Sequence, residues 1–255
     1  MQYRELGKTG LRVSLLGLGA VAFGRTEGLK YAVASRLPSM RDLSELLATA
    51  RDAGVNFVDT APAYGVSEER LGKLLTGQRD EWVLCTKVGE IFEAGTSRWD
   101  FSPEHTRRSV HESLQRLGTD RLDVVLVHSN GDDLEIIRNL GTLHMLAQLK
   151  KEGSIRAFGM SHKTIVGGLR AAEHCDVVMA TLSATATAEL DVVEHARKLG
   201  CGVLVKKPLD SGKAAPDEEV RRRSLQYVAS VAGVSSIVIG TTNPAHLLAN
   251  AAALA

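Results

Sequence analysis

Strand-like and helix-like segments alternate along almost the whole chain, and this alternation restricts the fold more than any other feature of the sequence. The predicted strands are short apolar runs with few polar interruptions, which is typical of parallel strands buried on both faces. They cover Val13–Leu18, Asn56–Val58, Trp82–Thr86, Leu122–Val127, Ile155–Met160, Asp176–Thr181, Gly202–Val205 and Ser236–Ile239. Eight strands, each followed by a helix, predict a (β/α)8 TIM barrel.

The helices expected between these strands begin and end at recognisable signals. Ser39 and Asp42 have the spacing of a capping box, Ser102 precedes a proline at a first helical position, and Gly54 is a helix stop. The predicted helices run from Ser39 to Ala53, Ser67 to Leu75, Ser102 to Leu117, Leu134 to Glu152, Ile165 to His174, Glu189 to Leu199, Val220 to Val231, and from Pro244 onward.

A doubly wound open sheet is the competing fold. Such a sheet should carry Gly-x-Gly-x-x-Gly at the start of its first helix. The stretch Gly17–Ala22 has alanine in place of the third glycine, and no helix is expected to begin there. The length of 255 residues matches one barrel of about 250. We therefore expect a single domain over residues 1–255, opened by a small β-hairpin from Tyr3 to Val13.

Composition excludes several classes of function. The net charge is +1, with both signs spread along the chain, so nothing indicates nucleic acid or a membrane surface as a partner. No apolar run is long enough to cross a bilayer, and the N-terminus lacks the apolar core of a signal peptide. Cys85, Cys175 and Cys201 are too far apart for a metal or redox motif. We expect a cytoplasmic protein with reduced cysteines, no metal and no required protein partner.

Polar side chains stand at the ends of three successive predicted strands. These are Asp59, Lys87 and His128, and Tyr64 lies on the loop that follows Asp59. The C-terminal strand ends of a barrel meet at one mouth, so the four side chains are expected to converge there. Each of them taken alone has a structural interpretation, as a loop cap, a buried histidine or a packing tyrosine. Their joint occurrence favours a catalytic group.

The chemistry of this set suits proton transfer to a carbonyl. A free tyrosine has a pKa of about 10, and a lysine ammonium about 4 Å away favours the phenolate by up to roughly 4 kcal/mol. Asp59 can keep Lys87 charged by pairing with it, and His128 can orient a carbonyl oxygen. Tyr64 would then protonate the carbonyl. No side chain is a source of electrons, so reduction requires a cofactor.

The sequence resembles the aldo-keto reductase family, in its short bacterial form, over nearly the whole chain. The matching stretches are Leu6-Gly7-Lys8-Thr9-Gly10-Leu11, Gly17-Leu18-Gly19, Asp59-Thr60-Ala61 with Tyr64-Gly65 and Ser67-Glu68, Thr86-Lys87, Ser113-Leu114 with Leu117, Leu122-Asp123 with His128, Gly159-Met160-Ser161, and Ile239-Gly240-Thr241-Thr242-Asn243-Pro244. The resemblance implies NAD(P)H-dependent reduction of an aldehyde or ketone on a barrel without a dinucleotide fold. It also implies a catalytic tetrad of Asp59, Tyr64, Lys87 and His128, with Tyr64 as general acid.

The half of the site that should hold the nicotinamide departs from the family pattern. Ser161-His162 stands where the family usually has Ser-Asn, and Met179 stands where it has a glutamine. Lys206, followed by Lys207, takes the place of an aromatic residue that commonly stacks on the nicotinamide. A cation there could instead contact a phosphate or ribose.

The last predicted strand leads into a segment suited to phosphate. A helix beginning at Pro244 would point its positive end at the preceding turn, although the turn could also be a simple helix cap. No basic residue stands where the family often contacts the 2′-phosphate, so NADPH is expected by family habit and NADH is possible. The candidate contacts in this segment are Gly240, Thr241, Thr242, Asn243, His246 and Asn250.

Four residues are expected to lie near the substrate at the barrel mouth: Ala20, Val21, Phe23 and Trp99. The chain stops soon after its last helix, so the long C-terminal loop that narrows specificity in many relatives is expected to be absent. We therefore expect an open pocket for a small-molecule carbonyl substrate, with little discrimination.

Two other functions remain open at this point. The first is a Schiff-base lyase with Lys87 as nucleophile, although pairing with Asp59 would keep that lysine protonated and non-nucleophilic. The second is a non-enzymatic, cofactor-sensing subunit on the same fold, which the altered nicotinamide contacts suggest.

Overall fold

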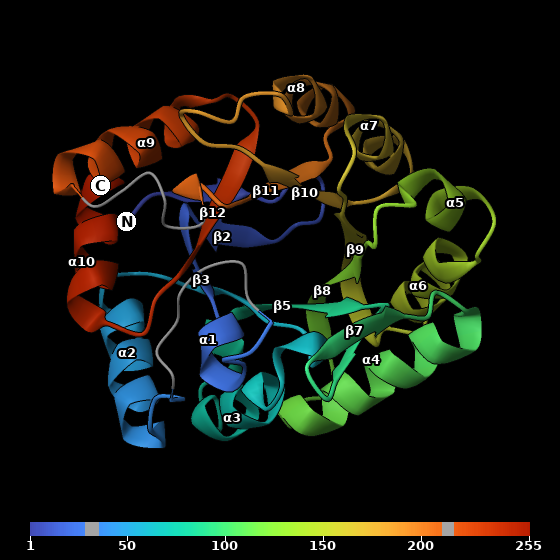
Figure 1. The fold of residues 1–255 in the computed structure, drawn as a ribbon, viewed down its shortest axis with the longest axis horizontal. Helices are drawn as coiled ribbons and strands as arrows, with labels where there is room; N and C mark the ends of the chain where they lie inside the picture. Colours follow the sequence, from blue (N-terminus) through green and yellow to red (C-terminus); the bar gives the residue numbers. More distant parts are fainter. Residues whose placement is uncertain (29–35, 211–216) are drawn as a thin grey trace.

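A computed structural model describes residues 1–28, 36–210 and 217–255, and shows a closed parallel barrel surrounded by helices (Figure 1). Each barrel strand pairs in parallel with the next, and the last pairs with the first. The strands are β3 (Leu16–Gly19), β4 (Phe57–Asp59), β5 (Val83–Val88), β8 (Leu122–His128), β9 (Ile155–Ser161), β10 (Val177–Thr181), β11 (Gly202–Lys206) and β12 (Val234–Gly240). The predicted (β/α)8 barrel is confirmed.

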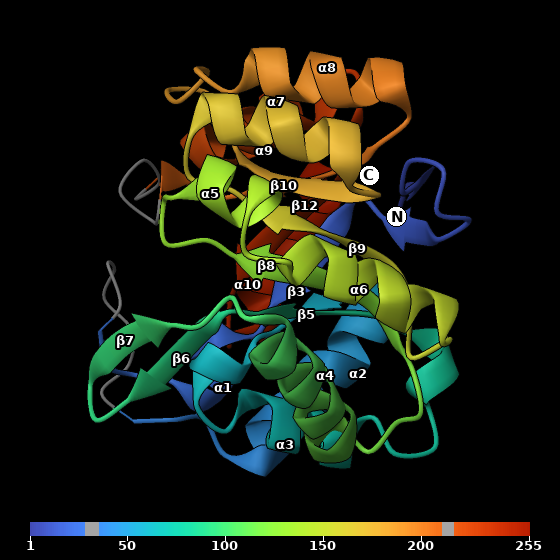
Figure 2. The same cartoon turned by 90° about the vertical axis from the view of Figure 1, so that its right-hand side faces the viewer.

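Helices form the outer layer of the barrel, as two perpendicular views show (Figures 1 and 2). Ser39 caps the second of them as predicted, because its hydroxyl and the Asp42 carboxylate exchange hydrogen bonds with each other's backbone N–H groups. None of the helices in the described ranges is long and apolar enough to span a membrane. The helices are α1 (Val21–Gly24), α2 (Met40–Asp52), α3 (Ser67–Leu74), α4 (Pro103–Leu117), α5 (Asp133–Arg138), α6 (Thr142–Lys151), α7 (Ile165–His174), α8 (Leu190–Leu199), α9 (Glu218–Ser230) and α10 (Pro244–Ala253).

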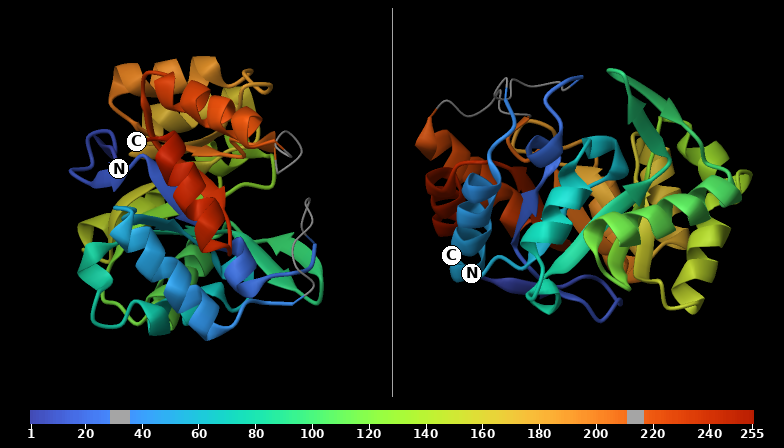
Figure 3. Two further views of the ribbon diagram at one scale, coloured as in Figure 1. Left: turned by 90° about the vertical axis from the view of Figure 1, so that its left-hand side faces the viewer. Right: turned by 90° about the horizontal axis from the view of Figure 1, so that it is seen from below.

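The predicted N-terminal hairpin, β1 (Tyr3–Glu5) and β2 (Arg12–Ser14), closes one end of the barrel. Three of its side chains are buried in the apolar cluster that fills the barrel interior. That cluster consists of Leu6, Leu11, Val13, Phe57, Cys85, Val124, Leu126, Ala157, Val177, Met179, Leu204 and Val238. The right-hand view of Figure 3 shows the N-terminal hairpin at one end and a second hairpin projecting at the other. The interior is therefore a packed core, and only the second end is left for a site.

That second hairpin is the main element that the sequence did not predict. The segment around Trp99 lies outside all the predicted strands and helices, but it forms β6 (Glu90–Glu93) and β7 (Thr96–Trp99), which pair antiparallel. The chain can turn into it directly after β5 because Gly89 has a φ of 102°, in the left-handed region that favours glycine. The short, mostly polar strands gave no alternating pattern by which to recognise them.

Three further boundaries differ from expectation. The predicted helix over 134–152 is divided into α5 and α6, because Gly141 adopts a φ of 73° between them. The first apolar run is divided at Leu15 into β2 and β3, one in the hairpin and one in the barrel. A helix does begin where none was expected, but α1 has only four residues and ends at Gly24.

Candidate active site

The barrel places the predicted acidic and basic side chains on neighbouring strands. Asp59 is the last residue of β4, Lys87 is the next-to-last residue of β5, and His128 is the last residue of β8. β4 pairs with β5, and β5 pairs with β8, both in parallel. The three side chains therefore lie at the same end of the barrel, opposite the N-terminal hairpin.

Asp59 and Lys87 form a buried ion pair. The Lys87 ammonium donates to Asp59 Oδ1 at 2.6 Å and to the Thr60 carbonyl oxygen at 2.9 Å. Burial by itself lowers the pKa of Lys87, but the charge of Asp59 and the nearby Tyr64 oxygen outweigh it, and the pKa is raised. Lys87 is therefore a permanent cation.

Tyr64 completes the group from a short 3-10 helix, η1 (Pro62–Tyr64). The Lys87 Nζ atom lies 4.9 Å from the centre of the Tyr64 ring. The Tyr64 and His128 rings meet edge to face, with centroids 6.2 Å apart and an interplanar angle of 88°. The structure thus brings all four predicted residues together.

Two residues that follow Tyr64 hold its loop in place. The Ser67 hydroxyl donates to the Ala20 carbonyl oxygen at 2.8 Å and lies 2.9 Å from the Thr60 hydroxyl. The fully buried Glu68 accepts from Thr86 Oγ1 at 2.5 Å and from Arg116 Nε at 2.7 Å. These contacts are structural, and they fix the loop relative to α1, β5 and α4.

Among the residues predicted to hold a nicotinamide, Lys206, the last residue of β11, contacts two of the others. Its ammonium donates to Ser161 Oγ at 2.9 Å and to the His162 carbonyl oxygen at 2.8 Å. Burial and the positive charges of Lys207 and Lys87 lower the pKa of Lys206 to about 8, against the opposing effect of Glu189. An ammonium carries three N–H groups, so two are used within the described residues and the third has no partner among them.

His162 and Met179 do not face this opening with their side chains. The fully buried His162 ring lies against α7, where a Cβ on Gly168 would be 2.6 Å from its Nε2 atom. That Nε2 atom is 2.8 Å from Glu189 Oε2. Met179 belongs to the apolar cluster inside the barrel. Of these two residues, only the backbone of His162 reaches the Lys206 ammonium.

The turn after β12 is exposed or partly exposed, and part of it caps α10. Asn243 Oδ1 accepts from the Ala245 N–H at 2.8 Å, and Thr241 Oγ1 accepts from the Asn243 N–H at 3.1 Å. Gly240, Asn243 and His246 are exposed, Thr242 is partly exposed, and Asn250 is buried. The capping interpretation and the phosphate interpretation of this turn are compatible, since α10 still begins here.

The four predicted substrate contacts separate into two groups. Ala20 and Phe23 are completely buried in the layer between barrel and helices, so their side chains cannot touch a ligand. Val21 is partly exposed, and Trp99 on the second hairpin is 39% exposed. The Lys163 Nζ atom lies 5.4 Å from the Trp99 ring centre. Trp99 and Val21 are the two that remain available.

Sequence analysis did not identify two charged residues that lie next to the group of Asp59, Tyr64, Lys87 and His128. Glu90 on β6 lies 2.7 Å from His128, and Arg25 lies 3.6 Å from Glu90. The only signal was a lone acidic residue three positions after Lys87, in a stretch without recognisable secondary structure.

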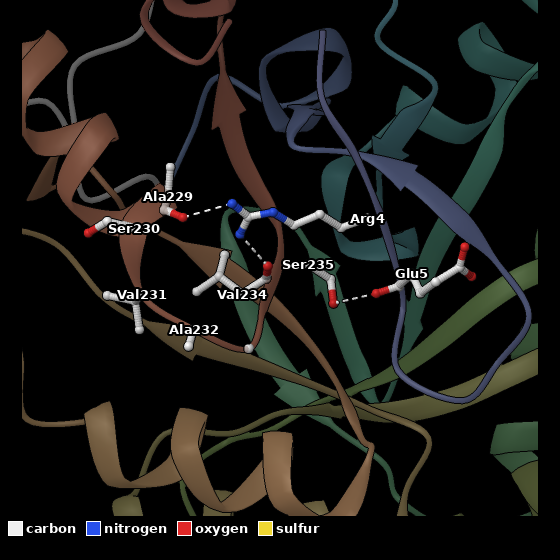
Figure 4. Close-up of a pocket in the computed structure, with 9 residues that line it drawn as sticks. Arg4, Glu5, Ala229, Ser230, Val231, Ala232, Val234 and Ser235 are labelled. Atoms are coloured by element: carbon white, nitrogen blue, oxygen red, sulfur yellow. Dashed lines mark hydrogen bonds between the residues drawn. The ribbon is translucent and has the colours of Figure 1, made fainter.

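A cavity of about 330 Å³ lies away from these residues, beside the N-terminal hairpin. It is lined by Arg4, Glu5 and residues 229–235, at the start of β12 rather than at its C-terminal end (Figure 4). The Arg4 guanidinium donates to the Val234 and Ala229 carbonyl oxygens at 2.7 and 2.8 Å, which joins the hairpin to the barrel (Figure 4). We assign this cavity no part in the site.

The fold defines a class of protein, a (β/α)8 barrel, and the four side chains form one polar group at its C-terminal end. Comparison with known proteins agrees. The profile of the Aldo/keto reductase family matches residues 15–223. The chain therefore belongs to the aldo/keto reductase family and is an oxidoreductase.

Individual relatives cover nearly the whole chain. It is similar to L-galactose dehydrogenase of Arabidopsis thaliana, with 28% identity over 100% of this chain and 88% of the plant protein. A crystal structure from Pseudomonas aeruginosa, assigned to the aldo-keto reductases, has a TM-score of 0.90 at 49% identity and covers 99% of this chain and 94% of that chain. The holo form of aldo-keto reductase AKR11C1 from Bacillus halodurans has a TM-score of 0.86 at 25% identity, over 100% and 91% of the two chains.

Proposed function

We propose that this protein is an NAD(P)H-dependent reductase that converts an aldehyde or ketone to an alcohol, with Tyr64 as general acid. One observation carries the proposal. The ammonium of the buried Lys87–Asp59 pair lies 4.9 Å from the centre of the Tyr64 ring, and the His128 ring meets the Tyr64 ring edge to face. A cation fixed beside a phenol favours its phenolate, so the phenol can give up and regain a proton at moderate cost.

Each side chain has one task in this scheme. Tyr64 donates its phenolic proton to the substrate oxygen as that oxygen becomes a hydroxyl. Lys87 stabilises the phenolate that Tyr64 becomes, and Asp59 keeps Lys87 protonated and in position. His128 orients the substrate oxygen by a hydrogen bond. In the reverse direction the same phenolate accepts the hydroxyl proton of an alcohol.

The described residues fit a nicotinamide cofactor at the open end of the barrel. Lys206 has one N–H group available beside Ser161, which suits a carboxamide oxygen. Gly240, Thr242 and the start of α10 offer exposed donors for a phosphate. The cofactor supplies the hydride that no side chain can provide. We propose NADPH as the cofactor, with NADH as the alternative, and a small carbonyl compound or sugar as the substrate.

The Tyr64→Phe variant tests the proposal. It removes the donated proton but keeps the ring, so kcat should fall by about 10²–10⁴-fold. The dissociation constant for NADPH, measured by fluorescence titration, should remain within about twofold of the unchanged protein. Unchanged turnover in Tyr64→Phe on a panel of aldehydes would contradict the assignment of Tyr64.

The aldehyde panel with the unchanged protein, and a borohydride trapping experiment, separate the two other functions. A cofactor-sensing subunit predicts that the unchanged protein binds NADPH but turns over no aldehyde. A Schiff-base lyase predicts borohydride trapping of a substrate on Lys87, and the raised pKa of Lys87 argues against it because a protonated amine is not nucleophilic.

A further inference from the structure

Glu90, the first residue of β6, presents a mostly buried carboxylate to the ring of His128. Its side chain is 12% exposed, and Oε2 lies 2.7 Å from His128 Nδ1. Its Oε1 atom accepts a hydrogen bond from Ser97 Oγ at 2.6 Å and lies 3.6 Å from Arg25 Nη1. The carboxylate is therefore held between a cation, a hydroxyl and the histidine.

Arg25 connects this arrangement to the loop of Tyr64. Its guanidinium lies 3.4 Å from the centre of the Phe92 ring on β6 and donates to the Ala63 carbonyl oxygen at 3.0 Å. Ala63 directly precedes Tyr64 in η1. The second hairpin is thus fixed both to the loop that carries the tyrosine and to the histidine.

The short distance between Glu90 and His128 indicates which ring nitrogen of His128 carries the proton. His128 Nδ1 has no aligned hydrogen-bond partner among the described residues, but an unprotonated ring nitrogen and a carboxylate oxygen would repel each other at 2.7 Å. Burial by itself raises the pKa of Glu90, but contacts with His128, Ser97 and Arg25 outweigh it and lower the pKa to about 2. Glu90 is charged at neutral pH, so the proton belongs to Nδ1.

The remaining nitrogen of His128 then has a defined role. The side chain is 22% exposed whereas Nδ1 is buried, so the exposed part of the ring lies away from Nδ1. Burial lowers the pKa of His128 and outweighs the opposing effect of Glu90, so the ring is neutral at pH 7. A neutral imidazole with its proton on Nδ1 has only a lone pair on Nε2. The charged and titratable groups around the ring are Glu90, Tyr64, Lys87 and Lys206, with Arg25 behind Glu90.

We propose that Glu90 is a positioning residue that keeps the single proton of neutral His128 on Nδ1 and so presents Nε2 to the barrel mouth as a hydrogen-bond acceptor. The ligand group that matches an acceptor is a hydroxyl, whereas a carbonyl oxygen carries only lone pairs. The inference rests on the proposed function and specifies it further. In neutral solution the site favours an alcohol, such as a sugar hydroxyl, and it binds a carbonyl through His128 only after the ring takes up a second proton.

The tautomer of His128 can be measured directly in the unliganded protein. Histidine 15N chemical shifts distinguish a proton on Nδ1 from one on Nε2, and a His128→Asn sample identifies the resonance. The expected result for the unchanged protein is a neutral ring protonated on Nδ1. A ring protonated on Nε2 would overturn the inference, whatever the stability of any variant.

Glu90→Gln tests whether the carboxylate is responsible. Loss of its charge should lower the pKa of His128, measured by the same titration, by about one pH unit. Glu93→Gln is the matched control, because it makes the same change on the same strand but at a side chain that is 68% exposed. The pKa of His128 should be unchanged in Glu93→Gln and partly restored in Glu90→Asp. Equal titration of His128 in Glu90→Gln and in the unchanged protein would overturn the inference.

Kinetics connect the titration to substrate choice. KM for an aldehyde should rise, and KM for the corresponding alcohol should fall, as the pH rises through the pKa of His128. Both transitions should move to lower pH by the same amount in Glu90→Gln. Failure to turn over any carbonyl or alcohol would contradict the proposed function. Turnover with KM values that do not change as His128 gains or loses its second proton would contradict only this inference.

Discussion

Two lysines at the barrel mouth are held in opposite ways. Lys87 donates to a carboxylate, which raises its pKa, whereas Lys206 donates to a hydroxyl and a carbonyl oxygen and has its pKa lowered to about 8. Hydrogen bonds to neutral partners do not fully compensate for the hydration that an ammonium loses on burial. The burial of Lys206 therefore lowers the stability of the fold. Ionisable residues with pKa values shifted in this way are often found at functional sites.

Lys206→Met should stabilise the protein at neutral pH. Because the folded protein binds this proton less tightly than the unfolded chain, stability rises with pH between about 8 and 10.5 and is lowest below pH 8. At pH 7 the variant should gain about 1–3 kcal/mol in the free energy of unfolding, measured with urea. The gain should disappear near pH 10.5.

A matched surface variant completes this test. Lys198→Met removes a lysine that is 65% exposed on α8 and should change stability by less than about 0.5 kcal/mol. If Lys206→Met were less stable than the unchanged protein at both pH 7 and pH 10, the hydrogen bonds to Ser161 and His162 would outweigh the cost of burial.

At the scale of elements, the two hairpins serve opposite ends of the barrel (Figure 3). The first fills one end with Leu6, Leu11 and Val13, and the second brings Glu90 to His128 at the end that holds the proposed active site. Both depend on glycine at a tight turn. Gly7 has a φ of 57° and approaches the backbone so closely that a Cβ would lie 2.3 Å from Gly202 N.

Gly7→Ala and Gly10→Ala form a pair that separates backbone strain from crowding. Gly10 has a similar φ of 71°, but no atom of the described residues outside its immediate neighbours lies within 4 Å of its added Cβ. Gly10→Ala should therefore cost only about 1–2 kcal/mol in the free energy of unfolding, from the left-handed conformation. Gly7→Ala should cost a further 1–3 kcal/mol or so from the backbone clash. Equal urea midpoints would show that the bottom hairpin is not packed against the strand end at Gly202.

At the scale of the whole molecule, the proposed site takes residues from six of the eight barrel strands. The proposed proton-donor group comes from β4, η1, β5 and β8, and the proposed cofactor contacts come from the ends of β9, β11 and β12. A ligand that bridges both groups binds only the folded barrel, so it should stabilise the molecule against global unfolding.

NADPH should raise the thermal unfolding temperature. At a concentration about 100 times its dissociation constant, it should add about 2.7 kcal/mol to the free energy of unfolding. For a protein of this size, that corresponds to about 5–10 °C. NADH at the same concentration should give a smaller shift if NADPH is the preferred cofactor. The absence of a shift with either nucleotide would contradict the cofactor assignment.

The sequence by itself determined the barrel and the group at its mouth. Buried parallel strands require continuous apolar runs, and the polar residues that end those runs must meet at one rim, so Asp59, Lys87 and His128 could be placed together before any coordinates. The capping box at Ser39 and the bottom hairpin follow equally local rules.

Only the tertiary structure decided which way the other side chains point. Phe23 and His162 were expected to face ligands, but both are buried. Phe23 lies in α1 and His162 follows β9, and a side chain in either place can pack outward against helices as readily as toward the barrel mouth. Glu90 reaches His128 through a hairpin with no hydrophobic signature, across 38 positions of sequence. Local pattern fixes where an element runs, whereas contacts between distant elements are settled by the packing of the whole barrel, and no single segment contains that information.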